Sequence, residues 1–425
     1  MKVFKFGGAS VKDANAVKNV ASILSLYKDE KLGVVISAMG KTTNAMEKVI
    51  DAYWNKSKEE FTSLIEERRR FHIEIIDELF ADSSLLIYEE VNGVLDGLLE
   101  YFDREASGNY DFEYDQIVGL GEVMSTKIVS AYLSYNGMQS KWMDARKLIF
   151  TNDTFREAEL DWEITTKNFK ANFKPEFETV DILVTQGFVG SNNGATTTLG
   201  REGSDFTAGV IAYCCDAEDV TIWKDVPGML NADPKWFDNT VKLDQISFRE
   251  AIELSYYGAS VIHPKTIKPL QNKEIPLYVK SFIDPHEDGT IIQSSMSKDH
   301  LVPSFIFKMN QILFSFTPKD FSFIVEKNLS DIFDRLSKAN AKINLMQNSA
   351  LNFSILLDED KVNTEEILDL FGDHYYVKFN EGLELVTIRH YDQATLDRVT
   401  VDKDVVLQQK TRETARLIVK QRIDI

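Results

Sequence analysis

The N-terminal decapeptide MKVFKFGGAS (residues 1–10) decides which class of fold the chain adopts. Its short apolar, β-prone run ends at Gly7 and Gly8, and apolar residues then recur at helical spacing from Asp13 to Tyr27. This pattern predicts a strand, a glycine turn and a helix. Backbone N–H groups in such a turn can approach an anion closely, and Lys5 adds a positive charge beside them. An ordinary buried strand with a tight turn fits the decapeptide equally well, so the rest of the chain must decide.

Length and composition restrict the class of protein. With 425 residues, the chain is expected to hold roughly two or three domains. Its 44% hydrophobic and 27% charged residues are typical of a soluble globular protein. Because it contains no apolar run of about 18 residues and no signal-peptide pattern, we expect a cytoplasmic protein. The net charge of −19 argues against nucleic-acid and membrane partners, since both require a basic face.

The cysteines indicate a reduced protein. Cys214 and Cys215 are adjacent in an apolar stretch. Neighbouring residues of a helix cannot easily form a disulfide. We therefore predict two buried, reduced thiols.

Short apolar runs alternate with helical patterns through the first two thirds of the chain. This alternation predicts a mostly parallel sheet with helices on both faces, an α/β fold. Polar loops follow several of the runs, and functional sites in such sheets gather at the carboxyl ends of the strands. A long helical pattern at 56–104 predicts packed helices, with a lid or a dimer face as alternatives. The predicted strands lie at 32–37, 181–189, 220–223 and 275–282, and the polar loops follow Phe6, Ile36, Val189 and Trp223.

A different pattern begins after residues 284–303, whose Ser, Asp, His and Gly content predicts a linker. The order strand, helix, strand, strand, helix, strand is ferredoxin-like (α+β) and suits a small ligand-sensing module. After His390 we expect about one further strand pair and a polar tail. The strands are predicted at 304–316, 341–347, 351–357, 375–379 and 383–390, and the helices at 329–340 and 364–371.

The densest polar loop spans residues 196–208 and leads into an apolar helix at 209–215. Its glycines make a turn, Ser204 or Asp205 would cap the helix, and Arg201 offers a fork of donors. The loop therefore suggests anion capture beside a catalytic carboxylate. A plain helix N-cap is the alternative role for Asp205.

A further polar cluster follows the predicted strand 220–223. Trp223 offers a flat wall, and Lys224, Asp225 and Lys235 offer polar contacts. A Trp at a strand end is more often part of the core than a nucleotide wall, so this cluster alone does not define a site.

Several motifs occur together, in order, along nearly the whole chain. In this order and spacing they resemble the aspartate kinase family, which belongs to the amino acid kinase superfamily and carries C-terminal ACT regulatory domains. Their combination is far more specific than a single glycine pair. The motifs are KFGGASV at 5–11, VISAMGKTTN at 35–44, TQGFVG at 185–190, LGREGSD at 199–205, WKDVPG at 223–228 with Ala-Asp-Pro at 232–234, and GASVIHP at 258–264.

The resemblance implies that ATP phosphorylates the side-chain carboxylate of L-aspartate to give 4-phospho-L-aspartate, the first step toward lysine, threonine and methionine. Mg²⁺ is expected to arrive with ATP and not through direct protein ligands. Because a free aspartate side chain has a pKa of about 3.9, the nucleophile is ionised at neutral pH and needs no general base. Phosphoryl transfer then depends on bringing two anions together and neutralising charge.

The resemblance also assigns roles to individual residues. Lys5 is expected to contact the transferring phosphoryl group, and Asp205 to orient Lys5 and, through water, Mg²⁺. Arg201 would pair with the α-carboxylate of aspartate and Glu122 with its ammonium, with first-turn helix capping as the alternative role of Glu122. The other expected contacts are Gly7, Gly8, Ala9 and Ser10 on the phosphoryl group, Ser37, Thr43 and Ser204 on the substrate, and Trp223, Lys224, Asp225, Pro234 and Lys235 on the nucleotide.

The chain departs from the family pattern at several positions. Ala9 replaces the usual Thr, and Leu230 replaces a frequent Tyr near the adenosine. Glu202 replaces the usual Gly, and we expect its side chain to point to solvent or to pair with a Lys. Ser260 stands where many members have a Lys that reaches the nucleotide phosphates. Lys265 is a candidate substitute, with a role in starting a helix as the alternative.

The resemblance places a catalytic domain at 1–290, with a helical insert at about 45–110, and an ACT-type regulatory region at 300–425. The second ACT unit is expected to be shortened after Tyr391, without a helix followed by an Asn-Ile turn. We expect feedback by an amino acid, lysine or threonine, and a homodimer. The expected effector contacts are Asn344, Gln347, Asn348 and Ser349.

Two alternative functions fit the sequence less well. Another member of the superfamily, such as a glutamate-type acyl kinase, shares part of the motif set. A non-catalytic amino-acid-sensing regulator would keep the fold but lose charges, whereas Lys5, Glu122, Arg201 and Asp205 are all present.

Overall fold

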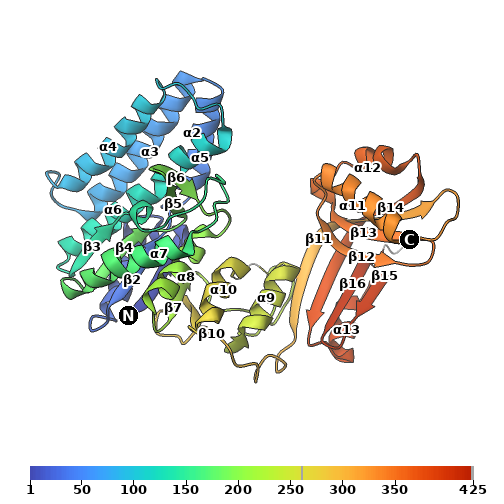
Figure 1. Ribbon diagram of the computed structural model, residues 1–425. Helices are drawn as coiled ribbons and strands as arrows, with labels where there is room; N and C mark the ends of the chain where they lie inside the picture. Colours follow the sequence, from blue (N-terminus) through green and yellow to red (C-terminus); the bar gives the residue numbers. More distant parts are fainter. Residues whose placement is uncertain (260–261, 423–425) are drawn as a thin grey trace. The chain divides into compact units, whose positions relative to one another are not determined.

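The computed structural model describes residues 1–259 and 262–422 (Figure 1). The described chain divides into two compact units, each with its own sheet. Assigning a catalytic role to one and a regulatory role to the other stays a prediction. The first unit comprises residues 1–230, 242–256 and 262–299, and the second comprises residues 231–241, 257–259 and 300–422.

Eight strands form one sheet in the first unit: β1 (Lys2–Phe6), β2 (Leu32–Ile36), β3 (Ser140–Met143), β4 (Ile182–Gln186), β7 (Val220–Lys224), β8 (Gln245–Ser247), β9 (Leu277–Ser281) and β10 (Thr290–Gln293). Their order is β3-β4-β2-β1-β7-β9-β10-β8, and the strands from β3 to β9 in this order are parallel. β10 runs antiparallel to β9, and β8 runs parallel to β10. The prediction of a mostly parallel sheet is therefore confirmed.

Helices cover both faces of this sheet. They are α1 (Ala14–Ser25), α6 (Leu120–Tyr135), α7 (Trp162–Asn168), α8 (Gly203–Cys215), α9 (Phe248–Tyr257) and α10 (Pro264–Asn272). Phe4 and Phe6 of β1 lie in a core that they share with α1 and α6. Because side chains alternate along a strand, Lys5 points to the opposite face, which α8 covers.

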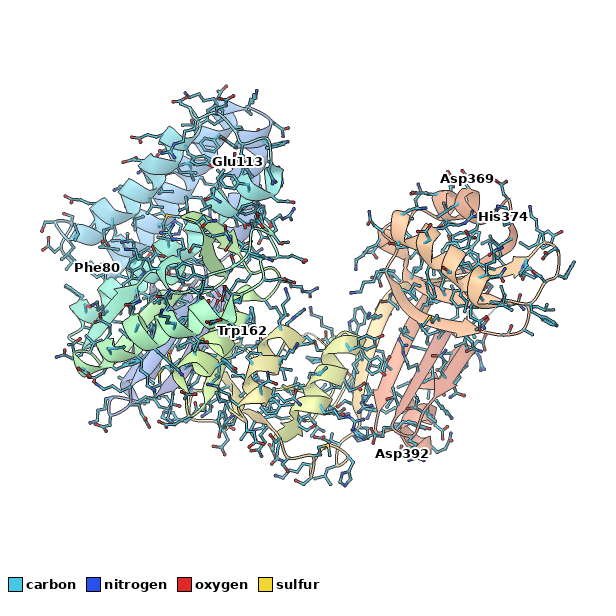
Figure 2. All side chains as sticks on the ribbon, in the orientation of Figure 1. Phe80, Glu113, Trp162, Asp369, His374 and Asp392 are labelled. Carbon is cyan, nitrogen blue, oxygen red and sulfur yellow. The ribbon has the colours of Figure 1, made fainter. Side chains whose placement is uncertain are left out.

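The predicted helical insert is present and packs against α1 and α6, which cover one face of the sheet. Its helices are α2 (Thr42–Trp54), α3 (Lys58–Leu79), α4 (Leu86–Tyr101) and α5 (Tyr110–Val118). Met46, Phe61 and Val91 of the insert belong to the same hydrophobic core as Phe4. Glu113 of α5, labelled in Figure 2, accepts hydrogen bonds from the Tyr101 hydroxyl and the Ser107 N–H. Packing therefore explains the long apolar pattern at 56–104.

Smaller elements complete the first unit. A two-stranded sheet pairs β5 (Val189–Asn192) with β6 (Ala195–Thr198). The buried cysteines Cys214 and Cys215 of α8 are free thiols, as predicted, and burial raises the pKa of Cys215 to about 12. Single helical turns are η1 (Gly8–Val11), η2 (Ala145–Lys147), η3 (Phe169–Phe173) and η4 (Lys174–Glu178).

The predicted linker at 284–303 is partly wrong, because β10 lies within it. Thr290 is fully buried, and its hydroxyl accepts a hydrogen bond of 2.8 Å from the Met229 N–H. Ile292 is buried beside it in the sheet. A four-residue strand inside a polar segment has too few apolar residues to show a period.

The second unit is an antiparallel sheet with helices. Its strands are β11 (Ser304–Pro318), β12 (Ile343–Asn348), β13 (Phe353–Asp358), β14 (Tyr375–Arg389), β15 (Lys403–Lys410) and β16 (Thr414–Gln421), in the order β12-β13-β11-β14-β16-β15. The helices are α11 (Glu326–Lys338), α12 (Thr364–Phe371) and α13 (Gln393–Thr400), with one turn, η5 (Glu359–Lys361). The order from β11 to β14 is the predicted ferredoxin-like one.

Two details of the predicted second unit are wrong. The runs expected as separate strands at 375–379 and 383–390 are one continuous strand, β14. A helix, α13, follows Tyr391, where we expected none. Asp392, labelled in Figure 2, caps that helix by accepting the Thr395 N–H at 2.8 Å. The helix is short, so the capping pair was its main sequence signal.

The long strands β11 and β14 join two halves of the second unit. A bulge between Lys308 and Gln311 interrupts their pairing, and Asn310 there has a left-handed φ of 52°. β13 pairs with β11 beyond the bulge, whereas β16 pairs with the later part of β14. The segment 231–241 belongs to this unit, and its Phe237 stacks on Phe305 with ring centroids 4.3 Å apart.

Candidate active site

A buried ion pair lies at the carboxyl end of β1. Lys5 Nζ is 2.7 Å from Oδ1 of Asp205, and both side chains are largely buried. Asp205 lies in the first turn of α8, where the positive end of the helix dipole favours a carboxylate. The glycine turn places the N-terminus of η1 three residues after Lys5, at Gly8. The structure therefore joins two residues that are 200 positions apart in the sequence.

The glycine turn leaves no room for side chains. A Cβ on Gly7 would lie 3.3 Å from Lys5 Nζ, and a Cβ on Gly8 would lie 2.7 Å from the Gly40 carbonyl oxygen. Ser10 is buried and its N–H donates to the Gly7 carbonyl at 2.9 Å, so this N–H is already used within the turn. Ala9 is exposed. Gly7 therefore lies beside the Lys5 ammonium.

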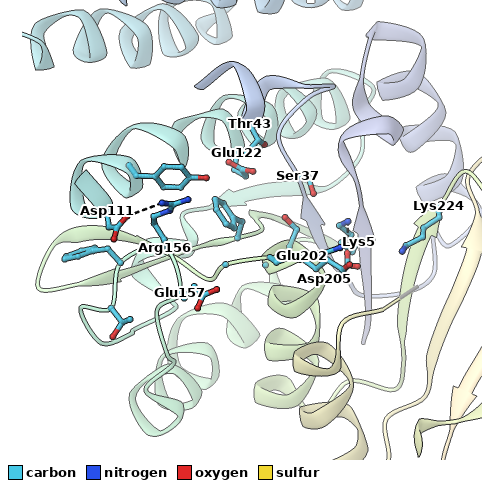
Figure 3. Close-up of a pocket in the computed structure, with 18 residues that line it drawn as sticks. Lys5, Ser37, Thr43, Asp111, Glu122, Arg156, Glu157, Glu202, Asp205 and Lys224 are labelled. Carbon is cyan, nitrogen blue, oxygen red and sulfur yellow. Dashed lines mark hydrogen bonds and ion pairs between the residues drawn. The ribbon is translucent and has the colours of Figure 1, made fainter. Parts of the chain in front are cut away.

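A cleft of about 820 Å³ opens beside the ion pair (Figure 3). Eight of the residues that line it are among the predicted site residues: Lys5, Ser37, Thr43, Glu122, Arg201, Ser204, Asp205 and Lys224. The sequence analysis missed another group, which comes from α5, the loop after β3 and the turn after β4: Asp111, Tyr114, Thr154, Phe155, Arg156, Glu157 and Phe188.

Glu122 is a buried carboxylate that faces the cleft. It lies in the first turn of α6 with 3% of its surface exposed. Burial raises the pKa of Glu122 to about 8, although hydrogen bonds from its own N–H and that of Ala38 oppose the rise. Its Oε2 atom has no hydrogen-bond partner among the described residues. A buried carboxyl group with an unpartnered oxygen is costly to ionise unless a cation binds it, so Glu122 is a candidate receptor for a positively charged group.

The hydroxyl residues of the cleft are positioned by packing. The Ser125 hydroxyl of α6 donates to the Ser37 carbonyl at 2.7 Å and fixes the end of β2. Thr43 begins α2. A Cβ on Gly187 would lie 2.4 Å from Cβ of Ser204, so the glycine after β4 is required for α8 to approach the sheet.

A loop after β3 forms one wall of the cleft. The carboxylate of Asp115, which is fully buried in α5, accepts the Thr198 N–H at 2.8 Å and the Arg156 N–H at 3.1 Å. Burial raises the pKa of Asp115, and these hydrogen bonds oppose the rise. Phe155 of the loop packs edge-on against Phe112. These contacts join segments about 40 and 80 residues apart, so no local pattern reveals them.

The expectation for Glu202 is wrong. Its carboxylate does not point to solvent or pair with a Lys but accepts the His263 N–H at 2.8 Å. Glu202 has a left-handed φ of 55°, a conformation that favours glycine. Ser260 lies outside the described residues. Lys265 is exposed on α10 and lines a different hollow from the cleft.

The predicted nucleotide residues are not gathered in one place. The side chain of Trp223 is 1% exposed and stacks on Phe6 in the core, so the expected flat wall is wrong. Trp223 pairs with Phe6 in the sheet register and therefore faces the same side. Lys224 lines the cleft and Asp225 is exposed. Pro234 and Lys235 belong to segment 231–241 of the second unit, and their role stays a prediction.

The predicted effector residues differ in how they are used. The Asn344 amide donates to Gln311 and to Asp358, and its oxygen accepts from Lys308 Nζ at 2.8 Å. These internal bonds occupy its side chain. Ser349 closes the turn between β12 and β13 through Asn352. Gln347 and Asn348 are exposed at the end of β12.

The described residues contain neither a metal-binding cluster nor a membrane-spanning helix. No cluster of three or more His, Cys, Asp or Glu side chains in this part of the chain could hold a metal ion. No described helix is both long and apolar enough to cross a membrane.

The comparisons with known proteins agree with this geometry. The model of the amino acid kinase family matches residues 1–281. The chain therefore belongs to the amino acid kinase family, and within it to the aspartokinases, as the motifs predicted. Lysine-sensitive aspartokinase 3 of Escherichia coli (strain K12) is 31% identical over 91% of this chain and 86% of its own length. An aspartokinase of Chlamydia muridarum is 30% identical over 87% of this chain and 81% of its own length.

Solved structures show the same relationship. The structure of Escherichia coli aspartokinase III in complex with lysine and aspartate (T-state) covers 98% of this chain and 95% of its own, with a TM-score of 0.83 and 27% identity. The same protein in complex with aspartate and ADP (R-state) gives a TM-score of 0.76 and 26% identity, covering 99% of this chain and 96% of its own. The α/β fold followed by an antiparallel ferredoxin-like region is thus that of an aspartokinase.

Proposed function

We propose that this enzyme transfers the γ-phosphoryl group of ATP to the side-chain carboxylate of L-aspartate and forms 4-phospho-L-aspartate. The Lys5–Asp205 ion pair at the carboxyl end of β1 carries the proposal, because it places a cation where two anions must meet. The relatives support it: one is a lysine-sensitive aspartokinase, and the solved structures of Escherichia coli aspartokinase III are complexes with lysine and aspartate and with aspartate and ADP.

The transfer step requires neutralisation of charge. Lys5 contacts the transferring phosphoryl group, and Asp205 holds the Lys5 ammonium in place. The backbone of Gly7, Gly8 and Ala9 supplies N–H donors beside it, with Ser10 contributing its side chain at most, since its N–H is bonded to Gly7. The aspartate carboxylate attacks phosphorus as ADP leaves, and no general base is needed.

The amino acid lies between Lys5 and Glu122. Glu122 binds the substrate ammonium, which donates a hydrogen bond to its unpartnered Oε2 atom. Arg201 lines the cleft, is exposed and has no ion pair with any residue that the structure describes, so its guanidinium is free to bind the α-carboxylate. Ser37, Thr43 and Ser204 supply hydroxyl contacts.

The nucleotide lies toward β7. Lys224 lines that end of the cleft, and Asp225 is exposed beside it. Pro234 and Lys235 are assigned to the nucleotide by the family motif alone. The Asp205 carboxylate beside Lys5 fits a Mg²⁺ ion carried by ATP. Mg²⁺ would neutralise phosphate charge, with Asp205 reaching it through water.

Regulation is assigned to the second unit. We propose that an amino acid, lysine in the first instance and threonine as the alternative, binds near Gln347, Asn348 and Ser349, and that the chain forms a homodimer. Asn344 is removed from the direct contacts because its side chain is occupied internally.

The test is a hydroxylamine trap with purified protein, ATP and Mg²⁺. Hydroxamate that depends on L-aspartate is expected. Hydroxamate formed with L-glutamate instead would reassign the enzyme to another acyl kinase, and none with either amino acid would favour the non-catalytic regulator. Adding lysine or threonine to the same assay tests feedback. Unchanged activity and unchanged melting temperature with both amino acids would refute the regulatory proposal.

A further inference from the structure

Arg156 combines two unusual features at the wall of the cleft. Its φ is 68°, in the left-handed region that side chains other than glycine rarely adopt. Its side chain lines the cleft, with 47% of its surface exposed. Strained backbone of this kind persists where the surroundings impose it, and it clusters at functional sites.

Contacts with α5 fix the direction of the Arg156 side chain. The guanidinium lies 4.5 Å over the ring of Tyr114, and one of its nitrogens, Nη1, is 3.2 Å from Oδ1 of Asp111. The Tyr114 hydroxyl donates to Glu47 of α2 at 2.9 Å, so the ring itself is held in place. The cation is therefore oriented before any ligand arrives.

The bond to Asp111 leaves the cation available. Both partners are about half exposed, and ion pairs of that kind contribute little to stability because water competes for both groups. A guanidinium has five N–H donors, and the hydrogen bond to Asp111 uses one of them. An incoming carboxylate can therefore exchange with Asp111 at small cost.

The place of Arg156 identifies the end of the substrate that it meets. Figure 3 shows Arg156 and Lys224 at opposite ends of the cleft, with Lys5 and Asp205 between them and Glu122 on the Arg156 side. The nucleotide is assigned to the Lys224 end. The ammonium and the α-carboxylate of an amino acid are bonded to the same carbon, so the group that binds the carboxylate must lie on the Glu122 side.

We infer that Arg156 is a second cation for the α-carboxylate of the amino acid substrate and acts with Arg201 to select an α-amino acid. This inference rests on the proposed function. In this inference, Asp111 holds the Arg156 guanidinium in position in the empty cleft and releases it when the substrate carboxylate binds.

The first test compares Arg156→Gln and Arg156→Gly in steady-state kinetics. Loss of one charge-assisted hydrogen bond should raise KM for aspartate about 10-fold in both variants. KM for ATP and kcat should stay within about twofold, because the reacting atoms are untouched. Glycine also relieves the left-handed backbone, so the melting temperature of Arg156→Gly should not fall. A raised KM in a stable variant cannot come from a damaged loop.

Asp111→Asn separates substrate binding from anchoring of the loop. If Asp111 only holds the guanidinium until the substrate arrives, KM for aspartate in this variant should equal or fall below that of the wild type. If Arg156 merely anchors the loop, Asp111→Asn and Arg156→Gln should raise KM equally, and the inference fails. Arg146→Gln is the matched control, because Arg146 pairs with Asp144 at 2.7 Å but does not line the cleft.

The outcomes distinguish this inference from the proposed function. A wild-type protein without aspartate-dependent hydroxamate would refute the proposed function and, with it, the inference. An active wild type with an Arg156→Gly variant of unchanged KM for aspartate would refute the inference alone. An effect of Arg156→Gln on KM for ATP in place of KM for aspartate would also refute it, since the cation would then serve the nucleotide.

Discussion

Two polar clusters, one in each unit, are built in opposite ways. In the first unit, Glu122 faces the cleft with an unpartnered oxygen, and burial raises its pKa to about 8. In the second unit, burial also acts to raise the pKa of Asp358, but hydrogen bonds from Gln311, Lys361 and Asn344 lower it to about 2. A buried carboxyl group with an oxygen that lacks a hydrogen-bond partner thus indicates a ligand site. A carboxylate whose hydrogen bonds are all made within the protein indicates a role in stabilising the fold.

The largest expected effect comes from removing the cation of the cleft. Lys5→Ala should lower kcat at least 100-fold, or about 2.7 kcal/mol or more in the barrier, by analogy with the loss of one preorganised donor. Lys2→Ala is the control. Lys2 lies on the same strand but outside the cleft, and its Nζ is 3.1 Å from a carboxylate oxygen of Asp219. The measurement is ADP formation in a coupled enzyme assay. Turnover of Lys5→Ala at the wild-type rate would refute the contact of Lys5 with the transferring phosphoryl group.

The next effect should come from Glu122→Gln. Without the carboxylate that receives the substrate ammonium, KM for aspartate should rise at least about 10-fold. Thermal stability should not fall, because Glu122, with a pKa of about 8, is uncharged at neutral pH in the empty cleft, as glutamine is. Glu90→Gln, which alters an ion pair with Lys127 at the protein surface, should leave KM unchanged.

The pH dependence of Glu122 gives a second measurement. Its folded pKa of about 8 lies above its ordinary value of 4.5, so the folded state holds a proton that the unfolded state releases between these values. Wild-type stability should therefore fall as pH rises from about 4.5 to about 8, and KM for aspartate should fall as Glu122 ionises near pH 8. If the free energy of unfolding of Glu122→Gln falls with pH over this range as steeply as that of the wild type, Glu122 is not the group that titrates.

Asp358 should show the opposite dependence on pH and a smaller effect. Its folded pKa is depressed, so its stabilising contribution is present above about pH 4 and is lost as pH falls toward about 2. Asp358→Asn should destabilise the second unit by about 1 kcal/mol, since the carboxylate is partly exposed and screened. The exposed Asp360→Asn is the control in acid unfolding. An acid midpoint that Asp358→Asn does not change would show that the network is not structural.

The local parts of the fold and of the site were predictable. Lys5, the glycine turn and Asp205 belong to patterns that a strand or a helix start imposes on its neighbours in the chain, and the parallel sheet follows from the alternation of strands and helices. Trp223 shows the limit. Both readings of a Trp at a strand end were open until the register of β7 against β1 placed it beside Phe6, on the face opposite Lys5.

The parts that could not be predicted depend on contacts across the chain. Arg156, Asp111 and Tyr114 meet because a buried carboxylate, Asp115, binds a loop about 40 residues away. No period or spacing in the sequence reports such a contact, and a left-handed arginine has no sequence signature. Asn344 was misjudged for the same reason, because its partners lie on β11 and β13.

The smallest effect is expected from a substitution of Glu202. This residue tests the contrast between Glu122 and Asp358 most directly, because its carboxylate lines the cleft but already accepts a hydrogen bond. In Glu202→Gly, relief of the left-handed backbone should offset about 1 kcal/mol from the lost hydrogen bond to the His263 N–H. The free energy of unfolding and KM for aspartate should both stay near wild-type values. A large rise in KM for aspartate would show that a carboxylate with a hydrogen-bond partner can still bind the substrate. The presence or absence of such a partner would then no longer distinguish ligand-binding carboxylates from structural ones.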